Sequence, residues 1–436
     1  MAVIKVNLEN QLKKIKPMHG GGQPPIGGEN LIRYFHYMTE AGIPYSRLHD
    51  VGGPYGSGRF VDIPNLFRDF DADENDPANY DFTFTDYIIK AIIDAKVEPY
   101  FRLGTTIENN SLIKAYHIYP PKDFHKWARI CEHVIRHYTE GWADGFHYNI
   151  RYWEIWNEPE VQNKMMWMGT DEEYYELYDI TAKHLKACFP HLMIGGYASC
   201  GFYAIAPKMK IDPEKRIAGT IPPTELEKRF IEFFEGFFEY IKKHNSPIDF
   251  FSWHSYADVS RVAIMDKWLH ERLEEYGYGD IETHLNEWNP FSTEFGTPHH
   301  SAEIAAMMLA LQHGHADVCC IYDMRTNTAP WCPLFDIRTH TPIHGFYAMK
   351  AFNRLYELGT QVETLCDNDR LYVVAATDGE HHAIMLSNLT KETQNLEIKG
   401  VDLTNAKFYV IDETRMLTEA PNTDRINNNE VFLIEW

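Results

Sequence analysis

The sequence lacks several features that mark common protein classes. Its 7 cysteines are odd in number and show no CxxC spacing, which argues against a disulfide framework or a zinc site. It contains no run of about 18 apolar residues, so we expect no membrane span. HExxH, P-loop and strand-associated GxGxxG motifs are also missing. We therefore expect no metal and no cofactor.

Basic charge is scarce as well. The chain has 41 Lys and Arg against 63 Asp and Glu, a net charge of −22. This balance disfavours nucleic acid and, less strongly, a polyanionic substrate. No leader pattern is visible, because residues 3–8 already read as a strand. We expect a cytoplasmic protein, or a periplasmic or secreted one if a leader has been removed; homo-oligomers are left open.

Two segments that end in a carboxylate are the most informative part of the sequence. Residues 151–159 read RYWEIWNEP, an apolar strand that Pro159 stops directly after Glu158. Residues 281–290 read IETHLNEWNP and place Glu287 in the same way. A single glutamate at a strand end is often an ordinary surface residue. Two of them, each flanked by Asn, Trp and Pro, favour a functional pair of the kind that glycoside hydrolysis requires.

Strand and helix signals alternate from Met18 to Leu358, which predicts a parallel α/β architecture with eight strands. After a first strand leading into residues 19–22, we expect strands at 44–49, 97–104, 148–158, 193–198, 248–256, 282–287 and 318–323. We expect helices at 29–40, 84–95, 124–138, 171–188, 224–244, 265–276, 301–314 and 345–358, and a long loop at 202–223. The short alternating runs after Leu358 predict an antiparallel β-sandwich. Residues 3–8 are expected to join its sheet.

Alternation along the strands predicts which side chains share a face. The three predicted sets are Tyr45, Arg47 and His49; Glu154, Trp156 and Glu158; and Ser252, His254 and Tyr256. Ionisable groups inside a barrel are costly unless they pair. We therefore expect Glu154 to be structural, paired with Arg47 or Arg102.

The chemistry assigns different roles to the two glutamates. A glycosidic oxygen needs a proton as it leaves, so Glu158 should be protonated at rest with a raised pKa. Glu287 should be ionised in order to attack the anomeric carbon. A nearby Arg47 and a hydrogen bond from the Tyr256 hydroxyl would favour that ionised form.

The motif WEIWNEP, followed by NEWN, resembles the clan A glycoside hydrolases. HGGG at 19–22, RLHD at 47–50, DFTFTD at 81–86 and WHSY at 253–256 narrow the resemblance to family 39. It implies a (β/α)8 TIM barrel over residues 15–357 and an accessory β-sandwich over 358–436 with 1–14. It also implies a retaining enzyme with Glu158 as acid/base and Glu287 as nucleophile. Their carboxyl groups would then lie roughly 5–5.5 Å apart, and Asn157 would hydrogen-bond the sugar 2-hydroxyl.

The family includes β-xylosidases and α-L-iduronidases, so we expect a carbohydrate substrate. The first expectation is an exo-acting, β-xylosidase-like enzyme on plant-type glycans. An iduronidase-like enzyme, an endo-acting glycosidase and a barrel that binds sugar without turnover remain alternatives. A basic subsite for the iduronidase-like case could come from Lys208, Lys210, Arg325 and Arg338. The expected sugar contacts are His49, His254, Tyr256, Trp288 and Trp331, although packing alone explains Trp331 equally well.

Overall fold

The computed structural model describes residues 1–27, 31–51, 60–107, 117–161, 165–211, 218–290, 294–326 and 332–436. Eight strands form a closed barrel, as the sequence predicts, in the order β10-β11-β2-β3-β4-β5-β6-β9. The barrel strands are β2 (Gly20–Gly22), β3 (Tyr45–Leu48), β4 (Glu98–Leu103), β5 (Tyr152–Ile155), β6 (Met193–Ser199), β9 (Phe250–Ser255), β10 (Glu282–Trp288) and β11 (Val318–Tyr322). The carboxyl ends of parallel barrel strands carry the active sites of this fold.

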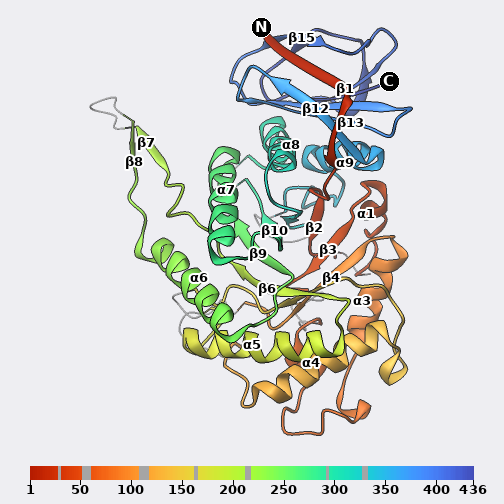
Figure 1. The fold of residues 1–436 in the computed structure, drawn as a ribbon. Helices are drawn as coiled ribbons and strands as arrows, with labels where there is room; N and C mark the ends of the chain where they lie inside the picture. The colour runs from red at the N-terminus through yellow and green to blue at the C-terminus, as the bar shows by residue number, and fades with distance from the viewer. Residues whose placement is uncertain are drawn as a thin grey trace. The chain divides into compact units, whose positions relative to one another are not determined.

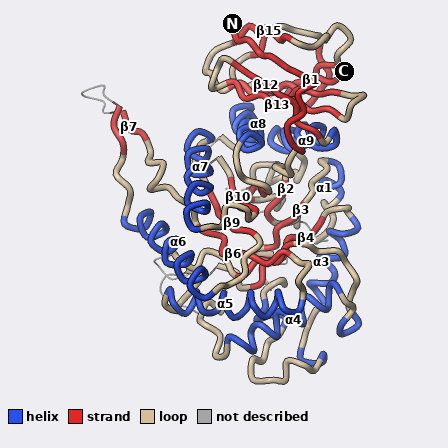
Figure 2. The backbone as a smooth tube through the Cα atoms, in the orientation of Figure 1, coloured by secondary structure: helices blue, strands red, loops and turns tan. Residues whose placement is uncertain are grey.

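Helices follow most of the barrel strands and lie outside them (Figures 1 and 2). They are α1 (His36–Glu40), α2 (Ile63–Leu66), α3 (Thr83–Asp94), α4 (Phe124–Thr139), α5 (Asp171–Cys188), α6 (Glu225–His244), α7 (Val259–Tyr276), α8 (Pro298–His313) and α9 (His344–Leu358). Of the helix expected at 29–40, residues 31–35 form turns and α1 begins at His36, while residues 29 and 30 lie outside the described residues. Among the described helices, none combines the length and the apolar composition that crossing a bilayer requires.

Local signals explain where the longest helices begin. Thr170 and Glu173 form a reciprocal capping box at the start of α5, and Thr224 and Glu227 do the same for α6. The buried face of α6 is an aromatic stripe, in which each fully buried ring contributes roughly 2 kcal/mol. The rings of that stripe are Phe230, Phe233, Phe234, Phe237 and Phe238, and Ile241 completes the buried face.

Contacts divide the chain into two compact units. Unit 1 comprises residues 1–45, 256–263 and 287–436, and unit 2 comprises residues 46–255 and 264–286. In unit 2, the long loop expected at 202–223 contains an antiparallel pair, β7 (Met209–Ile211) and β8 (Ala218–Thr220). The loop prediction was therefore wrong at these residues. The prolines and basic residues of the segment indicated a loop, and strands of three residues are too short to show an alternating pattern.

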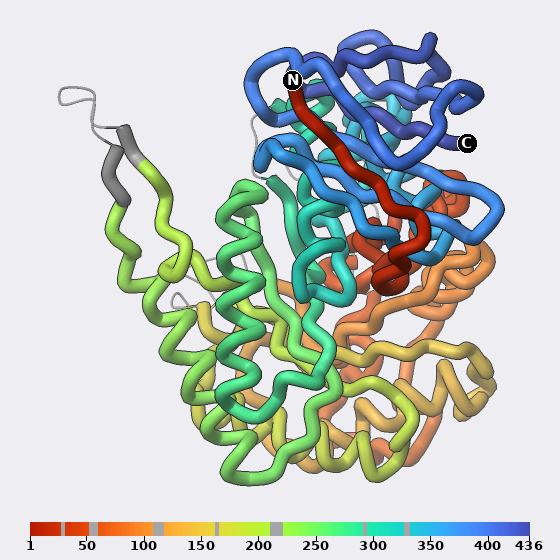
Figure 3. The backbone as a smooth tube through the Cα atoms, turned by 45° about the horizontal axis from the view of Figure 1, so that its top comes forward, coloured from red at the N-terminus to blue at the C-terminus, as the bar shows by residue number. Residues whose placement is uncertain are grey.

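Within unit 1, the accessory β-domain is present as one nine-stranded sheet in the order β17-β16-β19-β14-β13-β12-β1-β15-β18. The strands are β1 (Ala2–Lys14), β12 (Thr360–Cys366), β13 (Leu371–Thr377), β14 (His382–Asn388), β15 (Gln394–Lys399), β16 (Lys407–Ile411), β17 (Met416–Ala420), β18 (Arg425–Ile426) and β19 (Val431–Glu435). The expected N-terminal strand is confirmed: β1 lies between β12 and β15 (Figure 3). The boundaries 15–357 and 358–436 with 1–14 stay a prediction.

The glycines of β2 allow this strand to pack closely against β11 in unit 1. A Cβ on Gly20 would lie 2.6 Å from the Cys319 carbonyl oxygen, and one on Gly21 would lie 2.2 Å from the Met324 sulfur. Only glycine allows this close approach to β11 and the segment after it.

Candidate active site

The segment after β5 leaves the strand earlier than the sequence predicts. β5 ends at Ile155, and both Trp156 (φ 71°) and Glu158 (φ 46°) have left-handed backbone conformations. The expectation of a strand to residue 158, with Glu154, Trp156 and Glu158 on one face, was wrong. A positive φ breaks the pleat, so the alternation rule no longer applies.

Trp156 therefore points away from Glu154. Its indole Nε1 donates to the Met166 carbonyl oxygen at 2.8 Å, and its ring packs against Trp127 and Trp167. It also helps to line an apolar cavity of about 240 Å³. A backbone hydrogen bond fixes the position of Glu158, because its N–H donates to the Ala198 carbonyl oxygen at 3.1 Å.

Glu158 has the surroundings of a proton donor. Its Oε1 lies 2.7 Å from Nδ1 of His254, which is fully buried in β9. Burial raises the pKa of Glu158 to about 7. A hydrogen bond from the Cys200 thiol and the charge of Arg47 oppose that rise in pKa, and Asp50 adds to it. A carboxyl group with this pKa can exchange a proton near neutral pH.

A buried network lies beneath this residue in unit 2. Arg47 Nε donates to Glu154 Oε2 at 2.8 Å, and Arg47 Nη2 donates to Asn157 Oδ1 at 2.5 Å. Asn286 Nδ2 donates to the other oxygen of Glu154 at 2.6 Å. The predicted pairing of Glu154 with Arg47 is confirmed, whereas Arg102 pairs with Asp62.

The same network fixes the amide of Asn157. Its oxygen is occupied by Arg47, while its buried Nδ2 has no hydrogen-bond partner among the described residues. An unpaired buried donor is uncommon in a folded protein, because its desolvation costs about 1–3 kcal/mol. This donor is therefore left for a partner that the described residues do not supply.

Two further residues near Glu158 were missed by the sequence reasoning. Glu160 is 1% exposed, and its Oε1 accepts from the Cys200 backbone N–H at 2.6 Å. Burial raises the pKa of Glu160 to about 8, despite a hydrogen bond from its own backbone, and the Glu158 charge adds to that rise. Nothing in the sequence around Glu160 or Cys200 signals these contacts, because they depend on how the ends of β5 and β6 meet.

Glu287 is the corresponding residue of unit 1. It lies in β10, is 6% exposed, and its Oε1 accepts a hydrogen bond from the Tyr256 hydroxyl at 2.5 Å. The expected Tyr256–Glu287 contact is therefore confirmed. Next to it, Asn289 Nδ2 donates to the Tyr322 carbonyl oxygen at 2.8 Å. The hydrogen bond that the Tyr256 hydroxyl donates to Glu287 favours the ionised form of that carboxyl group.

The remaining candidate residues have varied surroundings. Nε2 of His49 lies 3.3 Å from Oδ1 of Asp50, and both residues are buried. Trp288 is fully buried. Trp331 lies outside the described residues. The sugar-binding roles of His49, His254, Tyr256, Trp288 and Trp331 stay predictions.

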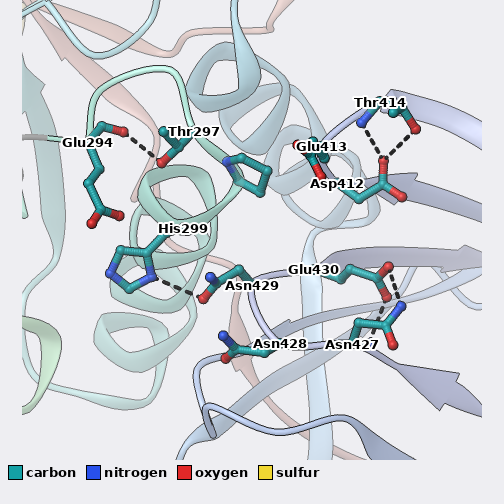
Figure 4. A pocket seen from close by; sticks show the side chains of 11 residues that line it. Glu294, Thr297, His299, Asp412, Glu413, Thr414, Asn427, Asn428, Asn429 and Glu430 are labelled. Atoms are coloured by element: carbon teal, nitrogen blue, oxygen red, sulfur yellow. Dashed lines mark hydrogen bonds between the residues drawn. The ribbon is translucent and has the colours of Figure 1, made fainter.

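Unit 1 also contains a polar cavity of about 570 Å³ (Figure 4). It lies where the start of α8 meets the loops around residues 412–414 and 427–430. His299 and Asn429, which share a hydrogen bond of 3.0 Å, are part of its wall. Its lining has neither of the candidate glutamates and no Trp, Tyr or Phe, so it lacks the ring surface on which sugars usually stack.

A closed parallel barrel with a carboxylate after β5 and another at the end of β10 has the construction of a clan A glycosidase. The model of the glycosyl hydrolases family 39 matches residues 55–326, which is more than half of the sequence. The chain belongs to this family of glycosidases.

Relatives of known activity support the same assignment. A β-xylosidase of Geobacillus stearothermophilus is 26% identical over 236 residues, or 52% of this chain and 39% of that protein. A β-xylosidase of Caldicellulosiruptor saccharolyticus is 27% identical over 192 residues, or 42% of this chain and 33% of that protein. The chain thus spans about two fifths or less of the length of these curated relatives.

Solved structures resemble the chain along its whole length. A glucosidase from Croceicoccus marinus has a TM-score of 0.77 at 20% identity, covering 100% of this chain and 98% of that one. A family 39 β-xylosidase from Caulobacter crescentus has a TM-score of 0.68 at 18% identity, covering 99% of both chains. At such identities the likeness establishes the fold alone.

Proposed function

We propose that the protein is a retaining glycosidase that works by double displacement, with Glu158 as acid/base and Glu287 as nucleophile. The observation that carries the proposal is the state of Glu158. In a chain of family 39, it is a carboxyl group with a pKa of about 7, in the turn that follows a barrel strand, and it is hydrogen-bonded to a buried histidine. An acid/base residue must be protonated in one step and ionised in the next, which such a pKa permits.

In the first step, the Glu287 carboxylate attacks the anomeric carbon while Glu158 gives its proton to the leaving glycosidic oxygen. The bond to the leaving group breaks and a glycosyl ester of Glu287 forms. In the second step, ionised Glu158 takes a proton from water, whose oxygen displaces Glu287 and restores the starting configuration. The free Nδ2 of Asn157 is suited to donate to the sugar 2-hydroxyl. The expected carboxyl separation of roughly 5–5.5 Å stays a prediction.

The substrate that we propose is a neutral β-glycoside of the β-xyloside type, cleaved from the chain end of plant-type glycans. The curated relatives are β-xylosidases, which supports this choice. The alternative with an acidic sugar needs free basic groups. Arg325, one of its candidates, is engaged through Nη2 with Asp323 at 2.5 Å, and that aspartate is fully buried. This pairing favours a neutral sugar over a uronic acid.

Product stereochemistry with azide tests the two roles. On an aryl β-xyloside, Glu287→Gly should lose turnover and, with azide, form a glycosyl azide of inverted configuration. Glu158→Ala should form the glycosyl azide of retained configuration, because azide then attacks the glycosyl ester without needing a base. The opposite pattern of configurations would exchange the assignments.

A barrel that binds sugar without hydrolysing it is the competing function. A panel of aryl glycosides separates the two functions, since an enzyme should hydrolyse at least one of them. Sugar binding by calorimetry without hydrolysis of any aryl glycoside would favour the binding protein.

A further inference from the structure

A cluster of three potential metal ligands joins helices α4 and α5 of unit 2. Glu132 lies on α4, and His184 and Cys188 lie one helical turn apart near the end of α5. The three ligand atoms all lie within 4.8 Å of one another. None of these residues takes part in the proposed catalysis.

The geometry is close to that of a metal site. Glu132 Oε2 lies 2.6 Å from His184 Nε2, and Cys188 Sγ lies 3.9 Å from the same nitrogen. Tetrahedral Zn²⁺, with bonds of about 2.0–2.3 Å, separates its ligands by roughly 3.3–3.7 Å. The Cys–His distance nearly fits already, and the glutamate needs to withdraw by less than about 1 Å.

The surroundings of the cluster also favour a bound ion. Glu132 uses its other oxygen, Oε1, to accept from Arg136 Nε at 2.7 Å. Outer hydrogen bonds of this type orient carboxylate ligands in metal sites. The His184 side chain is 30% exposed and that of Glu132 is 15% exposed, so an ion can enter and water can complete its coordination.

We propose that Glu132, His184 and Cys188 form a binding site for a borderline divalent cation of the zinc class, which links α4 to α5. One oxygen, one imidazole nitrogen and one sulfur form a ligand set that suits Zn²⁺ and excludes Mg²⁺ and Ca²⁺.

The test uses the full chain without a histidine tag, stripped with a chelator and titrated with Zn²⁺ against a chromophoric competitor. Wild type should bind one equivalent. His184→Ala and Cys188→Ser should each weaken that binding at least tenfold. Cys366→Ser, which changes a half-buried thiol of unit 1, is the matched control and should bind like wild type.

Cobalt provides a second measurement that does not depend on whether His184→Ala folds. Co²⁺ added to wild type should produce a thiolate-to-cobalt charge-transfer band, which Cys188→Ser should lack and Cys366→Ser should keep. The proposal is overturned if no band appears. It is also overturned if the variants bind Zn²⁺ as wild type does, since the ion would then be held by other residues of the chain.

Discussion

The burial of the Glu160 carboxyl group should make the stability of the protein depend on pH. The carboxyl group is 1% exposed, and its Oε2 has no hydrogen-bond partner among the described residues. Burial raises its pKa from 4.5 to about 8. The folded protein therefore keeps this proton over a pH range in which the unfolded chain loses it. Folding is penalised as pH rises above 4.5, and the penalty is complete above about pH 8.

The size of the effect follows from that difference in pKa. At 1.36 kcal/mol for each pH unit, the change from 4.5 to about 8 corresponds to roughly 5 kcal/mol. This is an upper limit, because water that enters the site on ionisation reduces the penalty. Glu160→Gln keeps the shape of the side chain, and its amide oxygen can still accept from the Cys200 N–H. The variant cannot ionise, so it should escape the penalty.

Urea unfolding of wild type and Glu160→Gln at about pH 5, 7 and 9 measures the difference. The two proteins should have similar unfolding free energies near pH 5, and the variant should become more stable by several kcal/mol near pH 9. Glu239→Gln, a change at an exposed position of α6, controls for the loss of one negative charge. A difference between wild type and Glu160→Gln that stays constant with pH would refute the reasoning.

Three further changes test the proposed catalytic residues. Tyr256→Phe removes the hydrogen bond to Glu287 and should lower kcat/KM by about 10–100-fold with unchanged Tm, whereas a wild-type rate would exclude a role for that bond. The value of kcat/KM should fall as pH rises through about 7, because Glu158 then loses its proton. Cys200→Ala should move this fall in kcat/KM to higher pH, since the Cys200 thiol lowers the pKa of Glu158. A shift to lower pH would contradict the hydrogen bond between Cys200 and Glu158. Arg47→Met leaves Glu154 buried without its cation and should destabilise the fold by about 3–5 kcal/mol in thermal or urea unfolding, with partial recovery in Arg47→Met/Glu154→Leu; equal losses in both variants would speak against the ion pair.

Much of this arrangement is predictable from the sequence, because periodicity and strand-ending prolines are local signals. The alternation of strands and helices gives the barrel, and the two Asn-Glu motifs place Glu287 near the end of β10 and Glu158 in the turn after β5. The pairing of Glu154 with Arg47 follows from the cost of an unpaired buried charge. What failed was the assumption of a regular pleat through Trp156, since no composition rule predicts a positive φ at a tryptophan.

Glu160 and Cys200 show the other limit of sequence reasoning. Glutamate is usually exposed, and a lone cysteine carries no functional pattern. Their importance comes from the meeting of two strand ends, where the Cys200 N–H reaches Glu160 and its thiol reaches Glu158. Tertiary contacts between residues 40 positions apart leave no trace in the local sequence.

The left-handed residues explain how this turn positions the proposed acid/base residue. A regular strand would project Trp156 and Glu158 to the same side, and a bulky indole would then compete for the space of the carboxyl group. The positive φ of Trp156 turns the indole into a separate buried site instead, where it donates to the Met166 carbonyl oxygen and packs against Trp127 and Trp167. Two such residues cost of order 1–3 kcal/mol each. Buried aromatic packing and the backbone hydrogen bonds from Trp156 to Leu103 and from Glu158 to Ala198 offset that strain, so the turn holds Asn157 against Arg47 and Glu158 against His254.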